Sequence, residues 1–123
     1  MIETLLLVVA VQLAEAPLPD TRARARANLA SYVVGNDYPR SAWQAGEQGT
    51  VRFRLEVGPD GRVANCQVTG SSGSVALDEA TCQIMRSRAR FTPARDGKGN
   101  ATADVFSSSI TWRVAQTAPA ETP

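Results

Sequence analysis

The sequence contains no histidine, and its acidic residues do not cluster. Histidine is the commonest general base and metal ligand, so its absence excludes Ser-His-Asp triads, Cys-His pairs and histidine-ligated metals. We therefore expect no catalytic residues, no metal site and no cofactor. The sequence predicts a protein that is not an enzyme.

The chain also lacks a strong excess of either charge. Of its 123 residues 20% are charged, and the formal net charge is +1. Such a balance provides no broad attraction to nucleic acid or to an anionic membrane. Arg22, Arg24 and Arg26 alternate with alanine and are conceivable as a nucleic-acid arm, but we interpret them as a solvated helix face. The length fits one domain with tails.

No apolar run is long enough to cross a bilayer, which takes about 20 residues. The longest uninterrupted run, Leu5–Val11, fits the core of a secretory signal instead, with Ala-Glu-Ala at 14–16 as a cleavage site. Glu3, the lack of basic residues before the run, and Pro17 after the cleavage site disagree with that reading. A buried element, or a true start upstream, is the alternative. We expect export, with residues 1–16 as a signal peptide or a short apolar segment.

The clearest local pattern is a β-hairpin over residues 50–68. Apolar and polar residues alternate in both halves, which predicts strands with one buried and one solvated face. Gly-Pro-Asp-Gly at 58–61 supplies the turn between them. The expected inward-facing residues are Val51, Phe53, Leu55 and Val57 in the first strand, and Ala64, Cys66 and Val68 in the second.

A helix is predicted from about Val75 to Arg88. Its apolar residues recur at helical spacing, and acidic residues lie in its first turn with arginines in its last, as the helix dipole favours. Ser72 or Ser74 is expected to cap it, and Phe91 beyond its end to enter the core. The apolar stripe consists of Leu77, Ala80, Thr81, Ile84 and Met85.

Shorter helices are expected before the hairpin. One is predicted from Arg22 to about Val34, docking through Leu29, Tyr32 and Val33. Another, from Ser41 to Ala45, ends at Gly46 and can bury Ala42 and Trp43.

A last strand is expected from about Ala103 to Val114, after a turn-rich loop at 95–102. The order of elements then indicates an α+β fold, in which a small three-stranded antiparallel sheet has helices packed on one face. The expected organisation is an N-terminal extension at 17–37, partly helical, a domain at 38–114, and a disordered tail at 115–123.

Only two cysteines are present, which is too few for a structural zinc site. Cys66 lies on the second strand and Cys82 on the covering helix, at the edge of its apolar stripe. Two separate thiols are possible, but we favour a disulfide, which would close a loop of about 15 residues. No C-x-x-C motif supports a redox enzyme.

A set of short motifs occurs in a fixed order over about Tyr38 to Val114, roughly two thirds of the chain. Its positions are Tyr38-Pro39, Ala42, Gly46, Gly49-Thr50-Val51, Val57, Asp60-Gly61, Val63, Val68, Ser71-Ser72-Gly73, Leu77-Asp78, Ala80, Phe91 and Pro93-Ala94. This ordered set resembles the C-terminal domain of TonB-type energy transducers.

The resemblance implies a periplasmic domain of a Gram-negative bacterium, exported and in the family associated with the inner membrane. Such a domain binds the TonB box, an extended peptide of outer-membrane TonB-dependent receptors. An ExbB/ExbD-like inner-membrane complex then drives uptake of siderophores, cobalamin or similar solutes. No nucleic acid is implied as a partner.

By resemblance the peptide would pair with the last strand, because a free sheet edge can accept an added strand. The expected binding residues are Asp104, Val105, Phe106, Ser107, Ser108, Ser109, Ile110 and Thr111. A mediocre edge strand is the alternative reading of the same residues. A second contact is expected at Asn36, Asp37 and Tyr38, although Asn36 and Asp37 depart from the family's glutamines.

Two departures from the family leave alternatives open. No full-length anchor is visible, and Pro17 and Pro19 do not make a proline-rich spacer. The chain is then a transducer whose anchor lies outside this sequence, or a stand-alone structural or adaptor module of the envelope. Such a module would bind envelope proteins, or form a homodimer, without transducing force.

Overall fold

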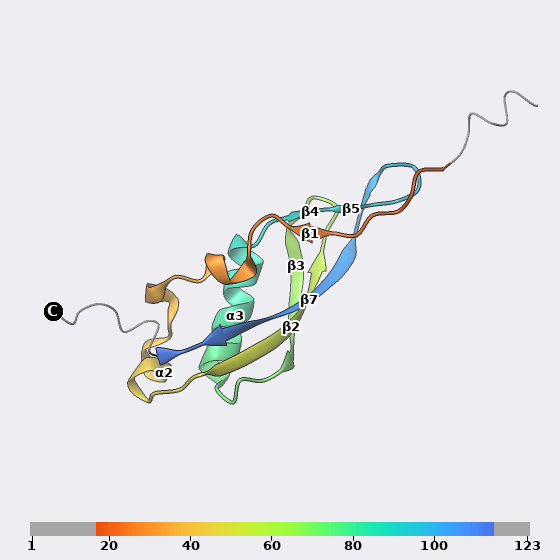
Figure 1. The fold of residues 1–123 in the computed structure, drawn as a ribbon. Helices are drawn as coiled ribbons and strands as arrows, with labels where there is room; N and C mark the ends of the chain where they lie inside the picture. Colours follow the sequence, from red (N-terminus) through yellow and green to blue (C-terminus); the bar gives the residue numbers. More distant parts are fainter. Residues whose placement is uncertain (1–16, 115–123) are drawn as a thin grey trace, which may run out of the picture.

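Three antiparallel strands form the sheet at the centre of the fold, in the order β3 (Val63–Gly70), β2 (Gly49–Val57) and β7 (Asp104–Trp112) (Figure 1). The structure is a computed structural model that describes residues 17–114. The predictions for residues 1–16 and 115–123 lie outside the described residues. The predicted α+β fold class is confirmed.

One face of the sheet packs against helix α3 (Val75–Arg88). The hydroxyl of Ser74 accepts a hydrogen bond from the backbone N–H of Leu77 and so caps the helix. The inward residues predicted for β2 and most of the α3 stripe are confirmed as core residues. Buried among them are Val51, Phe53, Leu55, Val57, Leu77, Thr81, Ile84 and Met85.

The short helix α2 (Arg40–Gln44) precedes the sheet, and Gly46 follows it with φ +69°. Ala42 is buried as predicted. The predicted burial of Trp43 is wrong: Trp43 is 44% exposed, because consecutive residues of a helix point about 100° apart and Ala42 already faces the core.

The predicted helix over Arg22 to Val34 is also wrong. This segment is extended: strand β1 (Arg24–Ala25) pairs with β4 (Phe91–Thr92), and only the 3₁₀ turns η2 (Leu29–Tyr32) and η3 (Gly35–Asp37) follow. Further backbone bonds join Thr21 to Arg95, and Leu18 to Gly97. Long-range pairing therefore overrides local helix propensity, although Leu29 docks in the core as expected.

Beyond β4 the chain forms a small hairpin from β5 (Ala94–Arg95) and β6 (Ala101–Thr102). Gly61, in the main hairpin turn, accepts a hydrogen bond from the backbone of Phe91 and has φ +81°. A Cβ at Gly61 would lie 2.2 Å from the carbonyl oxygen of Phe91, so the turn requires glycine here.

Strand β3 is interrupted by two register shifts against β2. Val57 pairs with Val63 but Glu56 pairs with Asn65, so Ala64 is an extra residue. The predicted burial of Ala64 is wrong for this reason, because the bulge turns the alternation and places Val63 inside instead. Cys66 and Val68 are half-buried against the core.

Candidate functional site

The two edge strands of the sheet, β3 and β7, differ in how regularly they pair with β2, and this decides how well each could accept an added strand. Strand β7 pairs with β2 along all 9 of its residues without a register shift. Strand β3 has an irregularity near each end, at Ala64 and at Thr69. Bulges twist an edge and protect it against pairing, whereas a flat regular edge invites it. The regular border is therefore that of β7.

The side contacts of Val105 show which backbone groups of β7 face away from β2. Its carbonyl oxygen accepts from Arg22 Nη2 at 3.2 Å, and its N–H donates to Asp104 Oδ1 at 2.7 Å. Because backbone direction alternates along a strand, Ser107, Ser109 and Thr111 also present N–H and C=O outward. We call these groups the outer edge of β7.

Within residues 17–114, no hydrogen bond from another segment reaches the outward N–H and C=O groups of Ser107, Ser109 and Thr111. The side chains of Ser107, Ser109 and Thr111 are small and exposed. Among them, the hydroxyl of Thr111 contacts that of Thr50, and the two oxygens lie 2.9 Å apart. A second backbone can therefore approach the edge closely. All eight residues predicted for peptide binding lie on β7, but their roles in binding remain a prediction.

The alternate residues of β7 point to the helix side of the sheet. Ile110 is buried, and Phe106 packs edge-on against Phe91 with ring centroids 5.0 Å apart. This packing holds β7 in place without using its outer backbone groups.

A hollow of about 190 Å³ lies beside the C-terminal half of β7. It separates the strand from the segment that carries the two 3₁₀ turns. Its walls include Ala30, Val33 and Val34 on one side, and Ile110, Thr111 and Trp112 on the other. We call it the β7 hollow.

Trp112 anchors the C-terminal end of β7. Its indole Nε1 donates to Thr81 Oγ1 at 2.9 Å, and its ring meets the Tyr38 ring edge-on with centroids 5.2 Å apart. The Tyr38 hydroxyl in turn donates to the carbonyl oxygen of Glu47. Burial and the Glu47 carboxylate raise the pKa of Tyr38, so this hydroxyl stays a donor at neutral pH.

The three residues of the predicted second contact, Asn36, Asp37 and Tyr38, lie in different surroundings. Asp37 binds both guanidinium nitrogens of Arg88 at 2.6 and 2.9 Å and accepts from the Val34 N–H. The hydrogen bonds from Arg88 hold the pKa of Asp37 below its usual value, against an opposing effect of burial. Tyr38 is buried. Asn36 is exposed and lines a wider hollow with Arg40.

The N-terminal segment reaches the beginning of β7. Asp104 Oδ2 accepts from Arg22 Nε at 2.8 Å and from the backbone N–H of Ala23 at 2.9 Å. The hydrogen bond from Arg22 is the main reason that the pKa of Asp104 lies far below its usual value. We call this group the Arg22–Asp104 clamp. Local pattern gave no sign of it, because the two residues are far apart in sequence.

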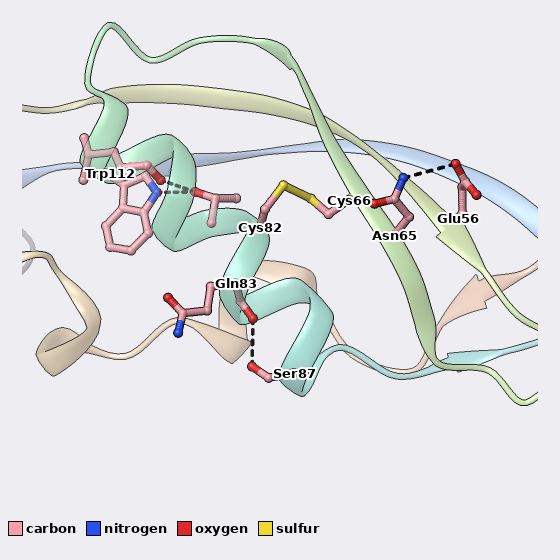
Figure 2. The surroundings of a disulfide bond; sticks show 9 residues. Glu56, Asn65, Cys66, Cys82, Gln83, Ser87 and Trp112 are labelled. Carbon is pink, nitrogen blue, oxygen red and sulfur yellow. Dashed lines mark hydrogen bonds between the residues drawn. A yellow bond between two sulfur atoms is a disulfide. The ribbon is translucent and has the colours of Figure 1, made fainter.

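Cys66 and Cys82 form the predicted disulfide, which joins β3 to α3 (Figure 2). The bond is at the β3 edge of the sheet, and β2 separates β3 from β7. Near the start of α3, Asp78 accepts from Ser71 and from the backbone and hydroxyl of Ser72. Burial raises the pKa of Asp78, but these hydrogen bonds together lower it below its usual value.

These three carboxylates predict sensitivity to acid. Asp37, Asp78 and Asp104 all have a pKa below 3.8 in the folded chain. A lowered pKa adds stability that is present above the unfolded value and is lost as the pH falls through the folded one. We expect the free energy of unfolding, measured with urea, to decrease steadily from about pH 5 to about pH 2. The variant Asp37→Asn should show a smaller decrease, and an equal one would contradict this assignment.

Comparison with known proteins identifies the family. The family model for the Gram-negative bacterial TonB protein C-terminal region matches residues 34–114. The chain belongs to the TonB C-terminal family. The TonB family comprises energy transducers and adaptors, so the expectation of a protein that is not an enzyme is confirmed by the family.

Two curated TonB proteins and one solved structure are similar to this chain. Protein TonB of Pseudomonas putida is 38% identical over 69 residues, which are 56% of this chain and 27% of that protein. Protein tonB2 of Pseudomonas aeruginosa is 39% identical over 61 residues, 50% of this chain and 22% of that protein. The NMR structure of the P. aeruginosa TonB C-terminal domain has 30% identity and a TM-score of 0.51, covering 62% of this chain and 75% of that one.

The chain thus spans about a quarter of the length of these curated TonB proteins. TonB homologues are proteins of the cell envelope, and the family in general interacts with outer-membrane receptors. No helix within residues 17–114 has the length and apolar character needed to span a membrane.

Proposed function

We propose that this TonB-family domain binds a TonB-box-like peptide of an outer-membrane TonB-dependent receptor by adding it as a strand to β7. The guest backbone would satisfy the N–H and C=O groups of Ser107, Ser109 and Thr111. Main-chain bonds supply affinity in this mode of recognition, and alternate side chains supply specificity. The observation that carries the proposal is the regular, unbulged border of β7.

The β7 hollow supports the same proposal. Side chains of an added strand alternate between the two faces of the sheet. Those on the helix side would lie next to Ile110 and Val33, two apolar residues that line the hollow. One apolar side chain of the guest would fill this space, while its neighbours stay in solvent beside Ser107 and Ser109.

Energy transduction, periplasmic location and engagement of an ExbB/ExbD-like complex are part of the proposal at the level of the whole protein. The family membership of residues 34–114 supports them. In the alternative, the same edge serves a stand-alone adaptor that binds envelope proteins or a second copy without carrying force.

A pair of substitutions at Ser109 tests strand addition. Ser109→Pro removes one outward N–H, whereas Ser109→Ala keeps it and removes only an exposed hydroxyl. We expect a synthetic TonB box peptide to bind the proline variant at least about tenfold more weakly, and the alanine variant with unchanged affinity. Affinity is measured by titration calorimetry, and the fold of both variants by circular dichroism.

Amide NMR spectra locate the contact. Peptide should shift the amide signals of Ser107, Ser109 and Thr111 in the unmodified chain. Unchanged signals at millimolar peptide, or equal affinity for both Ser109 variants, would contradict the proposal. Sedimentation at several protein concentrations separates peptide binding from homodimer formation through the same edge.

A further inference from the structure

The N-terminal segment ends the accessible part of β7 at a defined residue. Both outward groups of Val105 are occupied by side chains of the protein itself: the carbonyl oxygen by Arg22 Nη2 at 3.2 Å and the N–H by Asp104 Oδ1 at 2.7 Å. The next outward residue, Ser107, has no such partner within the described chain. Within the described residues, Val105 is therefore the last outward-facing residue whose backbone groups are bonded within the protein, and Ser107 is the first whose groups are free.

The clamp is held from several directions. Asp104 also accepts from the Ala23 N–H at 2.9 Å, and its side chain is only 15% exposed. Ala23 itself is buried, and the segment around it is fixed by the pairing of β1 with β4 and by the bridge from Thr21 to Arg95. The Arg22 side chain, by contrast, is 77% exposed. Asp104 therefore has a fixed position, and Arg22 closes over it from solvent.

We propose that the Arg22–Asp104 clamp is a register stop, which excludes Val105 and makes Ser107 the first rung available to an added strand. The inference rests on the proposed function, since a stop has meaning only where a strand is added. Side chains of a guest alternate with period two, so its register decides which of its residues faces the β7 hollow. The clamp would thereby determine which side chain of the peptide is read there.

The test compares Arg22→Ala and Asp104→Ala with a matched control, Arg24→Ala. Arg24 is an exposed arginine two positions along, whose side chain makes no hydrogen bond or ion pair within residues 17–114. Arg22→Ala frees the Val105 carbonyl oxygen, whereas Asp104→Ala frees the Val105 N–H. The control removes the same charge and leaves the clamp intact.

Amide NMR titration with a synthetic TonB box peptide gives the readout. In the unmodified chain and in Arg24→Ala, we expect shifts at Ser107, Ser109 and Thr111 and none at Val105. In Asp104→Ala the Val105 amide should join the responding set, and in Arg22→Ala the affinity should rise by about threefold to tenfold from one added main-chain bond. Circular dichroism shows whether the variants fold, and Arg22→Ala alters only an exposed side chain.

The failures of the two proposals can be told apart. Absence of any response in the unmodified chain overturns strand addition itself. A response that already includes Val105 in the unmodified chain overturns only the stop, as does a response unchanged in both clamp variants. A rise in affinity in Arg24→Ala equal to that in Arg22→Ala would assign the effect to charge rather than to the clamp.

Discussion

Reduction of the Cys66–Cys82 disulfide is expected to lower the free energy of unfolding by about 3 kcal/mol, which is the chain-entropy value for a loop of about 15 residues. The bond joins an edge strand to the helix that covers it, and the sequence separation is 16. Without it, the open chain gains freedom that folding must remove. Urea denaturation with and without a reducing agent measures the difference.

The double variant Cys66→Ala, Cys82→Ala serves as the control for the reductant. It should unfold at nearly the urea concentration that unfolds the reduced chain. Because the bond lies at β3 and not at β7, peptide affinity should be unchanged wherever the variant is still folded. A stability difference below about 1 kcal/mol, or a loss of peptide binding by folded protein, would contradict this account.

Substitution of Trp112 by alanine should have the largest effect of any change on β7. We expect a loss of about 3 to 5 kcal/mol, as for other large aromatic side chains removed from a core. The indole is only 3% exposed, and it connects the strand to Thr81 on α3 and to the ring of Tyr38. Its removal would also take away one wall of the β7 hollow.

Trp112→Phe separates ring packing from the hydrogen bond. It retains an aromatic ring against Tyr38 but lacks the indole N–H, so we expect a loss of only about 1 to 2 kcal/mol. Trp43, which is 44% exposed, remains as the fluorescence reporter in both urea titrations. Equal losses in the two variants would show that the bond to Thr81, and not the packed ring, is the dominant contribution.

The elements that the sequence predicted well are those with strong local periodicity. The alternation from Val51 to Val57 and the helical stripe from Leu77 to Met85 each record which side faces the core. The disulfide was predictable because the second hairpin strand carries Cys66 on its helix side, and the helix expected to cover that strand carries Cys82 at the edge of its apolar stripe.

The incorrect predictions concern contacts between distant segments. Arginine and alanine around Arg24 have good helix propensity, yet the backbone there pairs with Thr92 instead. The burial of Ala64 depended on an alternation that the bulge interrupts. The clamp between Arg22 and Asp104 follows from the extended path of the N-terminal segment, and no local pattern reveals such a path.

The unlike borders of the sheet also limit how copies of this domain can join. Two copies that paired through β7 would be related by a twofold axis, and neither copy would then have a free β7 edge. Pairing of β7 in one copy with β3 in the next would instead repeat without end, as in a filament. The bulges at Ala64 and Thr69 oppose that contact. We therefore expect the irregular strand β3 to disfavour end-to-end association of copies through β7.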